Sequence, residues 1–127
     1  MSDQNKNFER RVNRRFDVQL PLKLSSDGIK LETTTKNISC AGVYCRVNCF
    51  LPVMTKLELK MSIPIIEDNK KIEKKITTNA VIVRIDPEQE LPGCDSYDIG
   101  LFFMNIKEEH CNLISRYIQQ IFLASNN

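Results

Sequence analysis

Regular alternation of apolar and polar residues is the feature that most constrains how this chain can fold. The first alternating stretch places Val18, Leu20, Leu22 and Leu24 between polar residues and a proline. The same period of two returns at 29–35, 43–47, 57–63, 72–85 and 97–103. Successive side chains of a strand point to opposite faces, so each stretch is typical of a strand with one buried face. The pattern predicts strands over most of the chain.

Turn signals separate these predicted strands. Asp27-Gly28 is a strong hairpin signal, so the first two strands are expected to pair antiparallel. Polar and small residues at 37–42 interrupt the pattern before the third strand, and Pro64 is expected to end the fourth. The stretch 72–85 is too rich in Thr, Val and Ile for a comfortable helix, and it predicts a long, bent strand.

From Lys107 onward the apolar period becomes helical. One apolar stripe is formed by Cys111, Ile114, Tyr117, Ile118, Ile121 and Phe122. Asn105, with Glu108 three residues later, is expected to form a capping box. Six short strands followed by one amphipathic helix predict an all-β domain. We expect a small six-stranded antiparallel barrel whose C-terminal helix covers one opening.

The length of 127 residues accommodates one domain. We expect a flexible N-terminal segment at 1–9 and a single domain at 10–123. Within that domain, 10–16 is an arginine-rich arm, 17–104 the barrel and 105–123 the helix. No apolar run approaches the roughly 20 residues that span a bilayer, and no export signal is visible. A cytoplasmic protein without membrane insertion is therefore expected.

The cysteines and the single histidine argue against metal or catalytic chemistry. The five cysteines include no C-x-x-C pair, so we expect reduced thiols, several of them in the core. His110 lies at the start of the predicted helix, where a surface histidine needs no chemical role. The sequence contains no G-x-S-x-G, no Walker-type glycine loop and no H-E-x-x-H motif. Neither a metal site, a cofactor nor an enzyme is expected.

A cluster of arginines precedes the first predicted strand. Arg11 and Arg15 stand four residues apart with Arg10 before them, and Arg10 and Arg14 have the same spacing. A guanidinium forks two donors onto phosphate oxygens and can also pair with guanine O6 and N7. Taken alone, the cluster also fits a solvated basic tail.

A second candidate motif is the segment 37–42 (NISCAG). Asn37 and Ser39, two residues apart, are expected to project from the same side of an extended segment toward one ligand edge. Gly42 would let the backbone turn sharply or approach a ligand closely. Taken alone, the segment also fits an ordinary turn.

Together these two stretches resemble the PilZ domain family, whose signatures are R-x-x-x-R and [D/N]-x-S-x-x-G. The resemblance continues through the segments 20–22 (LPL), 97–103 (YDIGLFF) and 116–118 (RYI). It implies a six-stranded barrel that binds cyclic di-GMP on its outer surface. The arginine loop would wrap around the ligand.

The resemblance implies a set of ligand-binding residues, namely Arg10, Arg11, Arg15, Asn37, Ser39 and Gly42. The motif arginines would take phosphates and guanine edges, with Arg11 and Arg15 as the pair and the frame from Arg10 to Arg14 as the alternative. The amide and hydroxyl of the second motif would hydrogen-bond guanine and backbone, and its glycine would serve geometry. An arginine in the position of Arg10 tends to accompany two stacked ligands per chain.

Two other functions compete with this one. In a small barrel that binds RNA or DNA, the basic arm would grip phosphates. However, Tyr44 is the one aromatic residue expected to point outward near the signature, whereas stacking platforms offer several. A PilZ-like adaptor without ligand would act only through protein partners, but such members usually lack the arginines. We therefore expect a cyclic di-GMP receptor that changes conformation and signals to a partner protein, in motility, adhesion or exopolysaccharide control.

Overall fold

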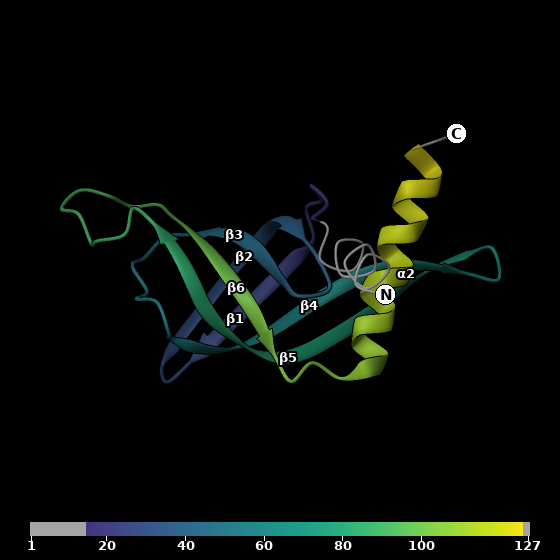
Figure 1. Cartoon of the computed structure of the whole chain (residues 1–127), viewed down its shortest axis with the longest axis horizontal. Helices are drawn as coiled ribbons and strands as arrows, with labels where there is room; N and C mark the ends of the chain where they lie inside the picture. Colours follow the sequence, from purple (N-terminus) through teal and green to yellow (C-terminus); the bar gives the residue numbers. More distant parts are fainter. Residues whose placement is uncertain (1–14, 126–127) are drawn as a thin grey trace, which may run out of the picture.

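The structure is a computed structural model that describes residues 15–125. Its elements are β1 (Pro21–Ser26), β2 (Ile29–Ile38), β3 (Gly42–Val47), β4 (Lys56–Glu67), β5 (Lys70–Asp86), β6 (Tyr97–Met104) and α2 (Glu108–Ser125). The strands close into a barrel in the order β1-β2-β3-β6-β5-β4, and every neighbouring pair is antiparallel (Figure 1). The predicted all-β fold, a six-stranded antiparallel barrel followed by a helix, is confirmed.

Residues 1–14 are not part of the described structure. The predicted flexible segment 1–9 and the arginines at positions 10, 11 and 14 therefore lie outside the described residues. Of the predicted arm at 10–16, the structure describes Arg15 and Phe16.

Alternate residues of the strands fill the interior of the barrel. On β6 these are Tyr97, Ile99, Leu101 and Phe103, all buried as the alternation predicts. On β5 the inward face predicted from the sequence is also buried, and it consists of Ile76, Thr78, Ala80 and Ile82. The register of β5 against β6 shifts between Ile82 and Arg84, which leaves Val83 half exposed. A bulge of this kind bends a strand, so the predicted long, bent strand is confirmed.

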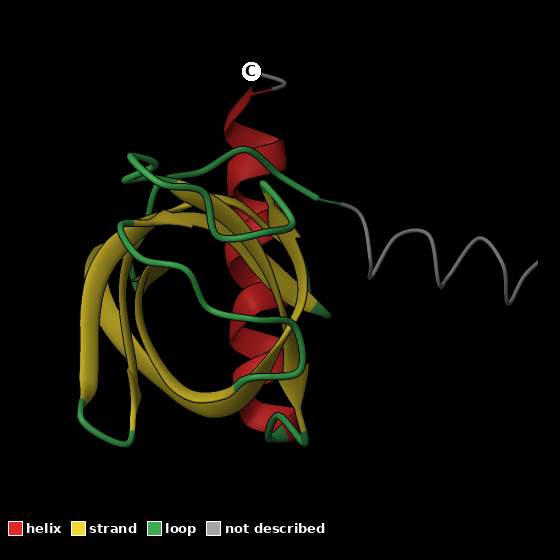
Figure 2. Cartoon of the chain, turned by 90° about the vertical axis from the view of Figure 1, so that its left-hand side faces the viewer, coloured by secondary structure: helices red, strands yellow, loops and turns green. Residues whose placement is uncertain are grey.

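Helix α2 covers one opening of the barrel. Figure 2 looks into the barrel and shows α2 lying across the far side. Ile114 is completely buried in the core, and Leu113, Tyr117 and Ile118 pack against it. No helix within residues 15–125 is long and apolar enough to cross a membrane.

The start of α2 differs from the prediction. Asn105 does not cap the helix, which begins at Glu108; instead the Lys107 carbonyl accepts the N–H groups of His110 and Cys111 at 3.0 Å each. Asn105 has a φ of 53°, a left-handed conformation that asparagine tolerates and that turns the chain after β6. His110 is also not a surface residue, because its side chain is only 13% exposed.

The prediction that Pro64 ends the fourth strand is wrong, because β4 continues to Glu67. Pairing of β4 with β1 stops at Met61, so this side of β4 is an edge from there on. The side-chain amide of Gln120 in α2 accepts the N–H of Ile66 and donates to its carbonyl, both at 3.1 Å. Residues two apart in a strand direct their N–H groups to the same side. The nitrogen of Pro64 therefore faces this edge, where no strand requires a donor.

Candidate ligand-binding site

The candidate site lies where the chain before β1 runs beside the end of β2. Phe16 and Ile38 exchange two backbone hydrogen bonds of 2.9 Å. Thr35, buried in β2, donates its hydroxyl to the Val18 carbonyl at 2.5 Å and accepts the N–H of Leu20 at 2.9 Å. These contacts hold the first described residues against β2.

Arg15 reaches from this segment to β2. Its Nη1 donates to Oδ1 of Asn37 at 2.8 Å, across 22 positions of sequence. The fold thus brings together one residue from each of the two short motifs. A guanidinium carries five N–H donors, so one bond to Asn37 orients the group and leaves capacity for a phosphate.

Ser39 shapes the turn between β2 and β3. The predicted interruption at 37–42 is shorter than expected, because Asn37 still belongs to β2 and pairs with Tyr44 of β3. The Ser39 hydroxyl oxygen accepts the N–H groups of Ala41 at 3.1 Å and Gly42 at 3.3 Å, and the residue is only 1% exposed. In this structure the hydroxyl is directed to the backbone of the turn and holds its shape.

A row of four paired residues crosses the outer face of the barrel from the arginine contact. Asn37 pairs with Tyr44, Tyr44 pairs with Gly100 of β6, and Gly100 pairs with Arg84 of β5. A Cβ placed on Gly100 would lie 3.4 Å from the Tyr44 ring and 3.5 Å from Cβ of Arg84. The glycine therefore lets an aromatic ring and the stem of an arginine lie close over the backbone of β6.

Tyr44 and Arg84 of this row also line an open groove of about 550 Å³. Its lining combines aromatic, aliphatic and charged side chains, contributed by Tyr44, Phe50, Pro52, Val53, Val83, Arg84, Ile85, Asp86 and Glu88. Apolar walls with a few convergent polar groups are typical of small-molecule sites. The groove extends the candidate site away from Arg15, along the outside of β3 and β5.

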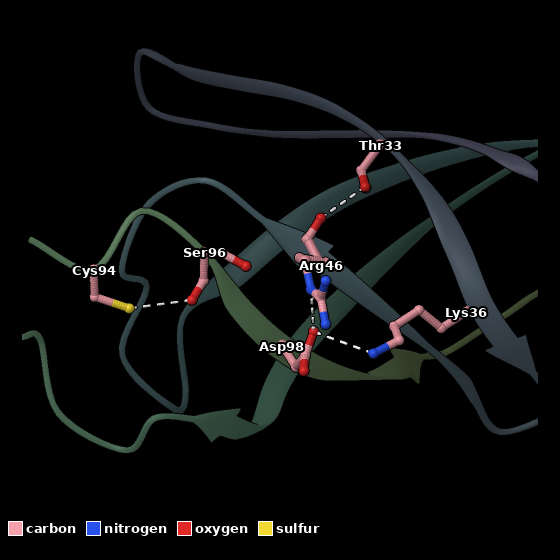
Figure 3. Close-up of polar contacts among 6 residues, drawn as sticks. All are labelled: Thr33, Lys36, Arg46, Cys94, Ser96 and Asp98. Carbon is pink, nitrogen blue, oxygen red and sulfur yellow. Dashed lines mark hydrogen bonds and ion pairs between the residues drawn. The ribbon is translucent and has the colours of Figure 1, made fainter.

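Asp98 organises the polar surface next to this row (Figure 3). Its Oδ1 lies 2.9 Å from Nε of Arg46 and 3.4 Å from Nζ of Lys36. The hydrogen bond from Arg46, with the charge of Lys36 nearby, holds the pKa of this carboxyl below its usual range. The Lys36 ammonium also lies 5.9 Å from the centre of the Tyr44 ring. These contacts hold Arg46 against Asp98 and Lys36 between Asp98 and the ring.

The structure brings together part of the predicted site. Arg15 and Asn37 are in contact, Ser39 lies in the adjoining turn, and Gly42 is the first residue of β3, opposite Phe102 of β6. Arg10 and Arg11 lie outside the described residues. In the part of the chain that the structure describes, no three His, Cys, Asp or Glu side chains are grouped so that they could hold a metal ion.

Sequence reasoning missed Arg84 and Gly100. Arg84 follows directly on a β-bulge, which redirects side chains and which the sequence alone does not locate. Gly100 carried a usable signal, because a glycine inside an apolar strand often marks a close approach of another group. Tyr44 was expected to point outward near the signature, and it does.

The PilZ domain family matches residues 9–120, most of the chain. The chain belongs to this family. The resemblance seen in the two signatures is thereby confirmed, and the family is one of receptor and adaptor domains. Among curated protein sequences, none matches this PilZ domain significantly.

Solved structures with the same fold include two PilZ proteins. The chain resembles the Bacillus subtilis inhibitor of motility, MotI/DgrA, with a TM-score of 0.71 and 18% identity. The match covers 89% of this chain and 51% of that protein, so the chain spans about half the length of MotI/DgrA. It also resembles the PilZ domain of CeSA from a cellulose-synthesizing bacterium, with a TM-score of 0.57 and 12% identity, over 86% of this chain and 98% of that domain. At these identities the likeness shows the fold.

Proposed function

We propose that this PilZ domain is a cytoplasmic receptor for cyclic di-GMP. The observation that carries the proposal is the 2.8 Å hydrogen bond between Arg15 and Asn37. This bond places a group suited to phosphate beside an amide suited to a guanine edge. The two groups come from the two signature motifs of the family, and they meet on the outer face of the barrel.

The arginines bind the phosphates. The contact with Asn37 supports Arg15 as the second motif arginine, and therefore Arg11, rather than Arg10, as the first. The segment that carries Arg10 and Arg11 continues directly from the described residues that are fixed along β2. Charge-assisted bonds from several guanidinium groups to phosphodiester oxygens would supply much of the affinity.

The row from Asn37 to Arg84 suits a guanine base. The Tyr44 ring lies over Gly100 and offers a stacking surface on the outer face of the barrel. Arg84 can donate to guanine O6 and N7, and the carboxylate of Asp86 in the same groove can accept N–H groups. Ser39 supports this surface by holding the turn through its hydroxyl oxygen.

Binding would bring the arginines, the ligand and the barrel together and so present a new surface to a partner protein. Arg10 provides a further cation, which favours two stacked ligand molecules per chain, because a second molecule doubles the phosphate charge to be neutralised. The partner acts in motility, adhesion or exopolysaccharide control. The likeness in fold to a motility inhibitor and to a cellulose-synthase PilZ domain supports this range of outputs.

Isothermal titration calorimetry of the purified chain with cyclic di-GMP tests the proposal. We expect saturable binding that weakens as the salt concentration rises, because ions screen the arginine–phosphate contacts. At about 100 times the dissociation constant, the ligand should stabilise the fold by roughly 2.7 kcal/mol, which is a clear increase in Tm.

Single-stranded RNA and DNA oligonucleotides serve as the comparison in the same assay. Binding of the oligonucleotides without binding of cyclic di-GMP would contradict the receptor and favour a nucleic-acid barrel. An absence of binding to all three would contradict it too, and would favour an adaptor that acts through proteins alone.

A further inference from the structure

A pair of thiols joins the second signature motif to the C-terminal helix. Cys40 occupies a variable position of the motif, directly after Ser39, and Cys111 lies in the first turns of α2. Both thiols are free and half-buried. We propose that Cys40 and Cys111 form a reversible disulfide that ties the turn between β2 and β3 to α2.

The geometry places both cysteine side chains at the same face of α2. The Cys40 Sγ lies 3.5 Å from Oγ of Ser115, so this side chain rests on the face of α2 that carries Ser115. Cys111 is four residues before Ser115 and therefore occupies the same face, one turn earlier. The Cys40 side chain contributes to the raised pKa of the Cys111 thiol, an effect that requires the two side chains to be near each other. A disulfide needs the two side chains to face each other at close range, and their position at one face of α2 favours this arrangement.

Burial raises the pKa of the Cys111 thiol, and the neighbouring Cys40 adds to the increase. The thiolate is the reactive form of a cysteine, and a raised pKa lowers the fraction of thiolate. We therefore expect Cys40 to react first and Cys111 second. Cys45 is a natural contrast within the same barrel. It is completely buried, and burial raises its pKa to about 12, so it should stay inert to thiol reagents.

Oxidised glutathione is a sufficient oxidant. The Cys40 thiolate attacks one of its sulfur atoms, the glutathione S–S bond breaks, and one glutathione leaves as a thiolate. Cys111 then loses its proton and attacks the Cys40 sulfur, which expels the second glutathione. The protein gives up two electrons and two protons, and one molecule of oxidised glutathione becomes two of the reduced form. Dithiothreitol reverses the sequence.

The cross-link would restrain two elements that otherwise meet through side-chain contacts. It closes a long loop of the chain, and such links chiefly reduce the freedom of the unfolded state. We expect the oxidised protein to melt about 5 to 15 °C above the reduced protein. The link would also fix the helix over the barrel opening and restrain the turn that carries Ser39.

Mass spectrometry of the full-length chain provides the test, and no ligand is needed. The folded protein is incubated with oxidised glutathione, quenched with acid and digested without reduction. We expect a species that has lost two hydrogen atoms and a peptide pair linked through Cys40 and Cys111. Cys40→Ala and Cys111→Ala should each abolish this species. Cys94→Ala, which removes another half-buried thiol, should leave it unchanged.

Two outcomes would overturn the proposal. One is glutathione attached to Cys40 or Cys111 with no linked peptide pair at any oxidant concentration. The other is an internal disulfide that forms as readily in Cys111→Ala as in the unaltered chain. Circular dichroism of both alanine variants shows whether they fold, and Cys111→Ser provides a second variant with a side chain of similar size. Because the readout is covalent, its result is independent of cyclic di-GMP binding.

Discussion

Gly42 and Leu101 lie so close in the barrel wall that β3 has no space for a side chain at position 42. A Cβ placed on Gly42 would come within 1.9 Å of the Leu101 carbonyl oxygen and 3.0 Å of its carbonyl carbon. Both of these are backbone atoms, which a rotamer change cannot move away. The glycine of the second signature is therefore required for strand packing, whatever it contributes to a ligand.

Gly42→Ala should accordingly destabilise the fold by about 3 kcal/mol or more, because β3 and β6 would have to separate. Urea unfolding followed by circular dichroism measures the change. Gly100→Ala is the matched control, since a Cβ there meets only side-chain atoms at 3.4 Å or beyond. Similar losses in the two variants would contradict this account of Gly42.

Arg15→Ala should reduce cyclic di-GMP binding about 100-fold or below detection, because a charge-assisted contact to phosphate is lost. Without ligand, the free energy of unfolding should stay within about 0.5 kcal/mol of that of the unaltered chain, since Arg15 is exposed. Calorimetry and thermal melting measure the two effects. Lys23→Ala removes the same charge from another exposed site and should bind normally. A large drop in Tm for Arg15→Ala would instead show a structural role.

Tyr44→Leu should weaken cyclic di-GMP binding about 5- to 50-fold, because it removes a stacking surface but keeps an apolar side chain. Gly100→Ala, which places a methyl group against this ring, should weaken binding as well while the protein stays folded. Calorimetry on both variants tests the row across the barrel. Normal affinity in both would exclude this surface and would leave the role of Arg15 untouched.

Arg10→Leu should lower the stoichiometry from two cyclic di-GMP molecules per chain toward one. The second molecule adds phosphate charge, and this variant removes a cation that can neutralise it. Calorimetry gives the ratio directly, and binding of the first molecule should persist. A ratio of one in the unaltered chain would refute the stacked pair without affecting the receptor assignment.

Asp98→Asn should lower Tm by about 1 to 3 °C at pH 7, because Arg46 and Lys36 lose their anionic partner. The pKa of Asp98 is lowered in the folded protein, so its contribution is present above the ordinary aspartate pKa of about 4 and is lost as the pH falls below it. The two melting curves should therefore converge in acid. Asp95→Asn, at an exposed carboxylate nearby, provides the control.

The strands were predictable because the barrel has one buried face throughout. Apolar residues at alternate positions, such as Ile99 and Leu101 or Ile76 and Ala80, mark that buried face in the sequence. The type of a single residue was misleading where contacts with a distant part of the chain decide the strand boundary. Pro64 looks like a strand end until its nitrogen is seen to face an edge covered by the helix.

The candidate site was predictable only as two short motifs. Their contact depends on Thr35, which holds the chain before β1 against β2 through its hydroxyl. No local pattern marks that role, because a buried threonine in a strand is unremarkable in sequence. Arg84 was likewise hidden, since its position follows from the bulge beside it.

The amide of Gln120 replaces a neighbouring strand for one residue of β4. In this position the helix occupies the backbone groups through which a strand of a second molecule could pair with β4. If α2 were displaced, the backbone groups of Ile66 would lose their partner, and an unpaired edge can recruit a strand from another molecule. The half-exposed side chain of Ile66 would lie on the same uncovered surface. The C-terminal helix thus covers an edge of the longest hairpin that would otherwise be open to another strand.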